Sequence, residues 1–167
     1  WFGGANGLIR FTDPAGERHD AIWYRMGDKT YPLSHNRIRH IYEDKEQQLW
    51  IATDGSINRY DYATRQFIHY NIVDNTGTYN TNWTYYIFED TAGQLWISTC
   101  LGGIFVVDKR KLMQSTSGQY IAEQNYSVHN GLSGMFINQI IPDNEGNVWV
   151  LLYNNKGIDK INPRTRE

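Results

Sequence analysis

The sequence lacks the residues that would support several common kinds of structure. It holds one cysteine, Cys100, which excludes an internal disulfide. It holds no run of about 18 apolar residues, so none of its segments is expected to span a bilayer as a helix. No histidine neighbours Cys100 in sequence, which favours a small buried thiol over a nucleophile.

An excess of charge of one sign is also absent. The chain has 16 basic and 18 acidic residues, which are interspersed and give a net charge of −2. Proteins that bind nucleic acid present a basic surface, and many that bind membrane surfaces carry a run of Lys and Arg. We therefore expect neither a nucleic-acid partner nor contact with a membrane by this segment.

Residue patterns for metal, cofactor or acid–base chemistry are missing as well. The five histidines form no HxH or HxxxH pair, and no Gly-rich phosphate loop precedes a helix. Glycosidases use two carboxyl groups that face each other across the sugar. The acidic pairs Glu43-Asp44 and Glu89-Asp90 instead recur at strand ends, where adjacent side chains diverge. No catalytic residue, metal or cofactor is predicted.

What the sequence does contain is a repeat. Tryptophan follows an acidic turn at Leu49-Trp50, Leu95-Trp96 and Val148-Trp149, and Trp1 stands at the matching place one unit earlier. The period is about 50 residues and varies by a few residues between units, as it does in propellers whose loops differ in length.

The unit 36–70 shows the internal organisation of the repeat. It contains four apolar or β-branched runs of strand length, at 36–43, 48–53, 56–61 and 65–70. The segments between them are too short for anything but hairpin turns, so consecutive strands pair antiparallel. The second run is apolar at successive positions, which indicates a strand covered on both faces by neighbouring sheets, as in a propeller blade. No helix is predicted.

We therefore expect an all-β fold, a partial β-propeller of about three to four blades, each a four-stranded antiparallel meander. The blades are placed at 1–25 (incomplete), 36–70, 82–126 and 135–167 (incomplete). In the third blade the last strand is placed at 119–126, and the basic, Ser-rich segment 109–118 is interpreted as a solvated excursion. The uncovered ends predict a fragment of a larger propeller that self-associates in isolation, as a two-fold dimer.

The two edges of the predicted sheets carry different kinds of residue. The turns that begin at Asp44, Asp90 and Asp143 are nearly the same in each repeat, which indicates turns closed by the Asp side chain. At the opposite edge, the entrances of the first strands and the second-to-third turns, such as Cys100-Leu101-Gly102, differ between repeats. Variable loops on a rigid scaffold are where binding usually takes place.

The candidate binding residues come from this variable edge. Aromatic rings there can stack on the C–H faces of sugars, and asparagine amides can hydrogen-bond to hydroxyls. The other interpretation of Trp83 and Phe136 is that they merely fill the central funnel. The candidates are His35, Arg37, Arg39, Tyr79, Asn80, Asn82, Trp83, Tyr85, Phe136 and Asn138.

The pattern N-x-I-x-x-I-x-E-D-x-x-x-x-L-W-I-x-T-x-G, ending in R-Y-D-x-x-T-x-x-F-x-x-Y, resembles the two-component regulator propeller repeat. It begins at Asn36 and ends at Tyr70, and the following blade keeps Asp90, Leu95 and Trp96 of it. The last blade departs from the pattern at Pro142, which takes the place of the Glu.

This resemblance implies a function. Such repeats build the periplasmic sensor region of hybrid two-component systems, in which two seven-bladed propellers and a small β-sandwich precede a membrane helix and a histidine kinase. It implies that the chain is a non-catalytic, ligand-sensing part of a seven-bladed propeller in the periplasm, within an inner-membrane protein. The expected partners are the remaining blades of the sensor and an oligosaccharide ligand.

Two alternatives to a sensor stay open. One is a glycan-cleaving or lyase propeller enzyme, and the other is a protein-interaction scaffold. Release of product from plant or host glycans would favour the enzyme, whereas saturable binding without turnover would favour the sensor.

Overall fold

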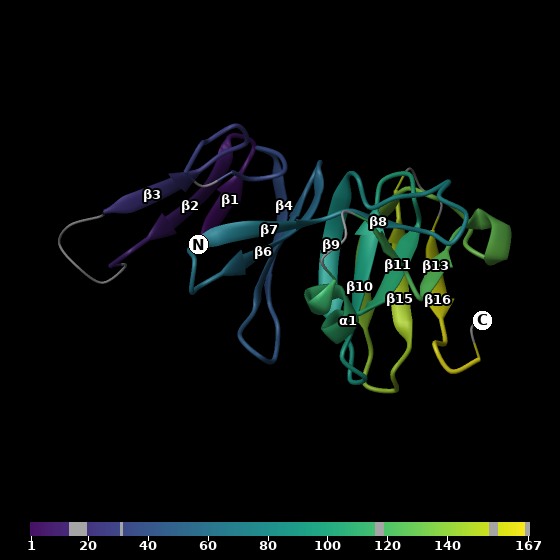
Figure 1. Cartoon of the computed structure of the whole chain (residues 1–167). Coiled ribbons are helices and arrows are strands. Elements are labelled where there is room, and N and C mark those ends of the chain that lie inside the picture. Colours follow the sequence, from purple (N-terminus) through teal and green to yellow (C-terminus); the bar gives the residue numbers. More distant parts are fainter. Residues whose placement is uncertain (14–19, 31, 116–118, 154–156, 166–167) are drawn as a thin grey trace.

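The computed structural model of the chain is a row of four antiparallel sheets, packed face to face in the order of the sequence (Figure 1). It describes residues 1–13, 20–30, 32–115, 119–153 and 157–165. The predicted fold class, a partial β-propeller, is confirmed.

Each sheet is a meander of consecutive strands. The first contains β1 (Phe2–Gly4), β2 (Gly7–Phe11) and β3 (Ala21–Tyr24). The second contains β4 (Ile38–Glu43), β5 (Leu49–Thr53), β6 (Ser56–Asp61) and β7 (Gln66–Tyr70). The third contains β9 (Thr84–Glu89), β10 (Gln94–Thr99), β11 (Ile104–Asp108) and β13 (Gln124–Tyr126). The fourth contains β14 (Ile137–Pro142), β15 (Val148–Leu152) and β16 (Ile158–Ile161).

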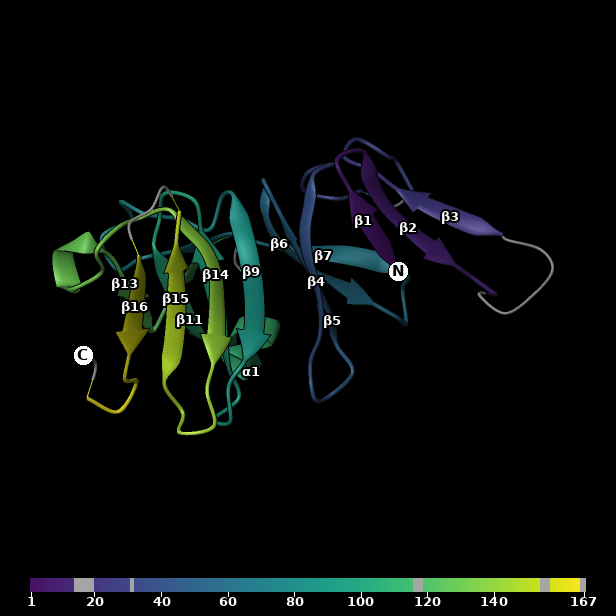
Figure 2. The same ribbon diagram turned by 180° about the vertical axis from the view of Figure 1, so that it is seen from behind.

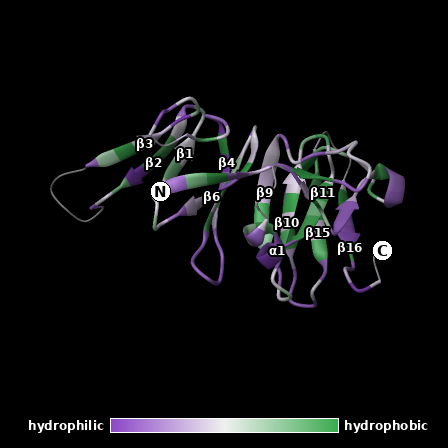
Figure 3. Cartoon of the chain, viewed as in Figure 1, coloured by the Kyte–Doolittle hydropathy of each residue, from purple (hydrophilic) through white to green (hydrophobic). Residues whose placement is uncertain are grey.

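Three apolar cores lie between successive sheets, and the hydrophobic residues are concentrated in the strands (Figure 3). Trp50 is fully buried between the second and third sheets, and Trp96 is 1% exposed between the third and fourth. The first strands lie nearest one another, because β9 contacts both β4 and β14. The first strands are therefore the innermost strands of the blades, as in a closed propeller.

The acidic turns lie together along one edge of the sheets, at the bottom of Figure 2. In each turn a carboxylate oxygen of the Asp accepts a hydrogen bond from the indole N–H of the tryptophan six residues later. The bond measures 2.9 Å from Asp44 to Trp50, from Asp90 to Trp96 and from Asp143 to Trp149. The other carboxylate oxygen accepts backbone N–H groups of the same turn. The prediction that the Asp side chain closes these turns is confirmed.

Two predictions about the segment that begins at Lys109 were wrong: it is not solvated throughout, because Lys109 and Leu112 are buried, and it contains a helix. Helix α1 (Lys109–Gln114) follows β11, and the carboxylate of Asp108 caps it by accepting the backbone N–H of Lys111. The side chain of Lys109 is almost fully buried, and its ammonium forms ion pairs with carboxylates of the second and third blades. Residues 116–118 of the predicted excursion lie outside the described residues.

The strand predicted at 119–126 is divided in two. Strand β12 (Tyr120–Ile121) leaves the third sheet and pairs in parallel with β8 (Ile72–Val73), which belongs to the bridge between the second and third sheets. Only β13 completes the third sheet. A short 3-10 helix, η1 (Val128–Asn130), follows it.

The outward face of the fourth sheet is apolar and uncovered by the described residues. Along β15 the side chains alternate between buried and exposed, so that Trp149 and Leu151 point away from the core. Ile141 on β14 and Ile158 on β16 pair with these two residues and are exposed on the same face.

Candidate functional site

The first strands of three blades are interrupted at the same place. In β4 the pairing with β5 skips Arg39, in β9 the pairing with β10 skips Tyr85, and in β14 the pairing with β15 skips Asn138. Such bulges leave one residue out of the ladder and redirect its side chain, and they are common next to active sites. The three skipped residues occupy equivalent positions in the repeat.

These three side chains meet in one cavity of about 420 Å³, which we call the axial pocket. It lies at the innermost strands, on the edge opposite the acidic turns. Its other lining residues are Cys100, Phe136, Ile137 and Tyr153. The pocket is thus built by three blades together, and no single repeat could form it.

The charge of Arg39 is neutralised within the pocket wall. Its Nε and one terminal nitrogen donate hydrogen bonds to the two carboxylate oxygens of Asp54, at 2.7 and 3.2 Å. The hydrogen bond to Asp54 raises the pKa of the guanidinium. The same group lies 4.5 Å from the centre of the Tyr85 ring, in a cation–π contact. Arg39 is therefore held in place by its neighbours from two blades.

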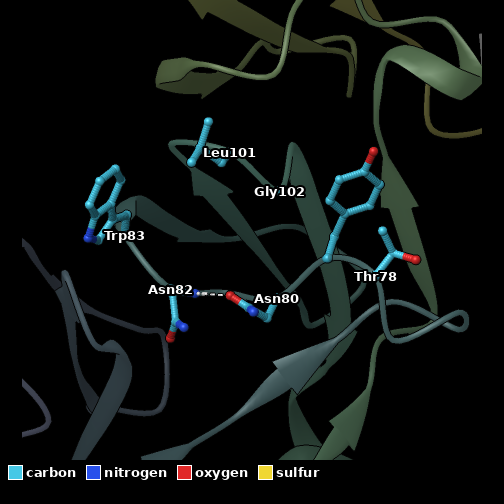
Figure 4. Close-up of a pocket in the computed structure, with 7 residues that line it drawn as sticks. Thr78, Asn80, Asn82, Trp83, Leu101 and Gly102 are labelled. Atoms are coloured by element: carbon cyan, nitrogen blue, oxygen red, sulfur yellow. Dashed lines mark hydrogen bonds between the residues drawn. The ribbon is translucent and has the colours of Figure 1, made fainter.

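A second cavity, of about 330 Å³, is lined in part by Leu101, which follows the axial-pocket residue Cys100 in the chain, and we call it the tryptophan pocket (Figure 4). Its lining residues are Thr78, Tyr79, Asn80, Asn82, Trp83, Leu101 and Gly102. The Asn80 side chain accepts the backbone N–H of Asn82 at 3.0 Å, which fixes the loop below the Trp83 ring.

Trp83 adopts a backbone conformation that is unusual for a bulky residue. Its φ angle is +54°, in the left-handed region, and its side chain is 48% exposed. Hydrogen bonds hold this backbone on both sides: its N–H donates to Asp54 O at 3.1 Å, and its carbonyl accepts from Cys100 N at 3.0 Å. Such strain persists only where the surroundings impose it, and it clusters at functional sites.

The structure brings together eight of the ten predicted site residues in these two pockets. Arg39, Tyr85, Phe136 and Asn138 line the axial pocket, and Tyr79, Asn80, Asn82 and Trp83 line the tryptophan pocket. His35 and Arg37 line neither. Arg37, whose side chain is 53% exposed, lies with its Nε 3.7 Å from the Asp54 carboxylate, and His35 Nδ1 accepts the backbone N–H of Arg37.

Sequence reasoning did not select several of the lining residues. Cys100, Leu101 and Tyr153 belong to second-to-third turns, which were placed on the correct edge but passed over in favour of strand entrances. Burial raises the pKa of the Cys100 thiol, which favours its neutral form over the more nucleophilic thiolate.

Two kinds of arrangement are absent from the described residues. These residues contain no group of three or more His, Cys, Asp or Glu side chains arranged to hold a metal ion. Within the same ranges, no helix combines the length and apolar character needed to cross a membrane.

Comparisons with known proteins agree with this architecture. The repeat described as the two component regulator propeller matches residues 32–55 and 131–154, which lie in the second and fourth blades. A comparison with curated proteins returned no match.

Solved structures give a more specific result. The chain is 98% identical, with a TM-score of 0.96, to the extracellular domain of a one component system, BT4673, from B. thetaiotaomicron. It is 99% identical, with the same TM-score, to the extracellular domain of BT4673 described as a hybrid two component system. It is fully covered in both cases but spans 22% of each solved chain.

A more distant structure shows the same fold. The extracellular domain of another hybrid two component system of B. thetaiotaomicron, BT3049, is 22% identical, with a TM-score of 0.58. The comparison covers the whole of this chain and 27% of that one. Because both BT4673 structures are of extracellular domains, the predicted location outside the cytoplasm is confirmed. The chain is therefore a segment of two-component regulator propeller repeats from the extracellular domain of a hybrid two-component system.

Proposed function

We propose that this segment carries a ligand-binding site of the sensor and that the ligand is a neutral oligosaccharide. The observation that carries the proposal is the convergence of three bulges on the axial pocket. In three blades the residue at the equivalent position is left out of the strand pairing. These residues are an arginine, a tyrosine and an asparagine. Repeats that were only structural would have no reason to differ at these positions.

The chemistry of the pockets suits sugars. Trp83, Tyr85 and Phe136 offer aromatic surfaces on which the C–H faces of a sugar ring can stack. Among the described residues, the side-chain amides of Asn82 and Asn138 have no hydrogen-bond partner, so they are free to bind hydroxyls. Apolar walls with a few convergent polar groups are typical of small-molecule sites.

The charges of the pockets favour a neutral ligand. The positive charge of Arg39 is already paired with Asp54. The described lining of the axial and tryptophan pockets contains no Asp or Glu, so neither a cation nor a pair of acid–base groups has a place there. Glycoside cleavage by the usual mechanism requires two carboxyl groups. This supports a binding function over the glycan-cleaving alternative.

The test is direct binding with product analysis. We would titrate gluco-, xylo-, manno- and galacto-oligosaccharides, with oligogalacturonides as an anionic series, into the chain and into the longer BT4673 extracellular domain. Saturable binding without new chromatographic products is expected. Trp83→Ala and Asn138→Ala should each weaken binding, the former by roughly tenfold. Asn144→Ala, an exposed asparagine in an acidic turn, is the matched control.

Two outcomes would contradict the proposal. Product release would identify an enzyme instead of a sensor. Failure of every oligosaccharide to bind, in a protein shown to be folded by circular dichroism, would overturn the proposed ligand class and leave the interaction scaffold as the remaining alternative.

A further inference from the structure

A third cavity continues the tryptophan pocket towards the outer rim of the third blade. It has a volume of about 520 Å³ and lies between the bridge that precedes β9 and the segment around β13 and η1. We call it the rim trough; its lining residues include Asp74, Asn75, Tyr79, Glu123, Gln124 and His129. Thr78 and Tyr79 line both the rim trough and the tryptophan pocket, so the two cavities are contiguous.

Tyr79 is a fixed ridge between the two cavities. Its hydroxyl lies 3.1 Å from Nε2 of His129, and its backbone N–H donates to the Asp74 carboxylate at 2.8 Å. Its partly buried ring packs against the core between the second and third sheets. A ligand that entered both cavities would therefore cross a ring whose position is already set.

The walls of the trough are held together by the pairing of β8 with β12. Backbone hydrogen bonds run from Tyr120 N to Asn71 O at 2.8 Å and from Ala122 N to Val73 O at 2.9 Å. This parallel pair joins the bridge to the outer part of the third blade. The trough is therefore formed before any ligand arrives.

The two acidic residues of the trough are engaged by the protein itself. The Asp74 carboxylate accepts the backbone N–H groups of Thr76 and Tyr79. The Glu123 carboxylate accepts the Tyr120 hydroxyl and the Asp108 backbone N–H, both at 2.8 Å. No described residue hydrogen-bonds the side-chain amides of Asn75 and Gln124. The two amides that the described residues leave unpartnered are uncharged donors and acceptors, which suits hydroxyl groups.

We infer that the rim trough is a second subsite for the same ligand, which runs from the tryptophan pocket over Tyr79 to the rim. This inference rests on the proposed oligosaccharide function. The path crosses the third sheet from its innermost strand, β9, to its outermost, β13, which is roughly 14 Å at the usual spacing between strands. The ligand is therefore a neutral oligosaccharide of several units, and single sugars fill only part of the site.

The test uses the same neutral oligosaccharide series, graded from the monosaccharide to the hexasaccharide, with the BT4673 extracellular domain. Affinity should rise with length until the rim trough is filled. The double variant Asn75→Ala/Gln124→Ala should weaken binding of the longest members by roughly tenfold and leave the shortest members unaffected. Asn144→Ala again serves as the control.

The outcomes separate this inference from the proposed function. Affinity that does not depend on length, or a double variant that binds long oligosaccharides normally while Trp83→Ala does not, would overturn the second subsite and keep the first. A double variant that weakens short and long members equally would also overturn it. If the unmodified domain binds no member of the series, the proposed function itself fails and the inference fails with it.

Discussion

The ammonium of Lys109 lies 3.0 Å from the carboxylate of Asp44, although the two residues are 65 positions apart in the chain. It also lies 2.8 Å from Glu89 and 3.2 Å from Glu46. Burial opposes the charged form of Lys109, but the hydrogen bonds to Glu89, Asp44 and Glu46 outweigh burial and raise its pKa. One side chain of α1 therefore joins the second and third blades.

Removing this charge should destabilise the protein strongly. Lys109→Met leaves the buried Asp44 and Glu89 carboxylates unpaired, which should cost about 3–5 kcal/mol in the free energy of unfolding. Urea unfolding followed by tryptophan fluorescence measures the change. Lys111→Met, in the same helix with a side chain 66% exposed, should change stability by less than about 0.5 kcal/mol. Equal losses in the two variants would show that the buried ion pairs do not account for the contribution of Lys109 to stability.

The repeated tryptophans should differ in their contribution to stability because they differ in burial. Trp96 is 1% exposed and Trp149 is 42% exposed, yet both donate the same hydrogen bond to an Asp. Trp96→Ala should cost roughly 3–5 kcal/mol through the cavity it leaves. Trp149→Ala should cost about 1 kcal/mol, as expected for an exposed hydrogen bond. A loss below about 1 kcal/mol for Trp96→Ala would contradict its place between two blades.

The strained backbone at Trp83 predicts an unusual order of stability. Glycine adopts positive φ without penalty, whereas alanine does not. Trp83→Gly should therefore be more stable than Trp83→Ala by about 1 kcal/mol, although both lack the ring. Thermal unfolding of the two variants gives the comparison, and the reverse order would argue against a left-handed conformation at this position.

Because of His40, the protein should become less stable as the pH is lowered below neutrality. Burial lowers the pKa of His40, its ring stacks on Tyr86 with centres 3.9 Å apart, and its Nδ1 accepts the Ile87 backbone N–H. The unfolded chain binds the proton first, at a pKa of about 6.5. The stabilisation is therefore complete above that pH and is lost as the pH falls through the folded-state pKa.

Urea unfolding between about pH 5 and 7.5 measures this dependence. His40→Asn keeps a hydrogen-bond acceptor without a titrating group, so it should flatten the curve in this range. His69→Asn, at an exposed position in β7, should leave the curve unchanged. An unaltered slope in His40→Asn would assign the pH dependence to other groups.

The uncovered face of the fourth sheet predicts that the isolated chain self-associates. Leu151 and Ile158 are cross-strand partners, 39% and 63% exposed, on an apolar face that also presents Trp149. Light scattering at about 100 μM should detect dimers or larger species. Leu151→Gln/Ile158→Gln should shift the chain towards monomer. A monodisperse monomer of the unmodified chain would refute this prediction.

The blade framework could be predicted because its signals are local and repeated. The Asp residues, the tryptophans six positions later and the hairpin turns recur within each unit, so the face opposite the acidic turns could be identified too. The bulges could not be predicted from the sequence. Whether Arg39 is skipped depends on its register against β5, and sequence alone shows equivalent positions without showing how they pair.

The features that were missed depend on distant contacts. The run Lys109–Lys111 has the composition of a solvated segment, and only the folded arrangement brings Asp44 and Glu89 to the ammonium group of Lys109. Strands β8 and β12 are two residues each, too short for any periodic pattern, yet their pairing holds the walls of the rim trough together.

The Asp–Trp hydrogen bond has a consequence for how the chain acquires its structure. Its two ends are six residues apart, so the bond forms within one hairpin and closes only a short loop. Contacts within such a hairpin are local in the sequence, and short loops and hairpins close on the microsecond timescale or faster. A protein that folds outside the cytoplasm emerges there segment by segment. Each hairpin of this chain can close as soon as it has emerged, which shortens the time for which its apolar strands are open to aggregation or proteolysis.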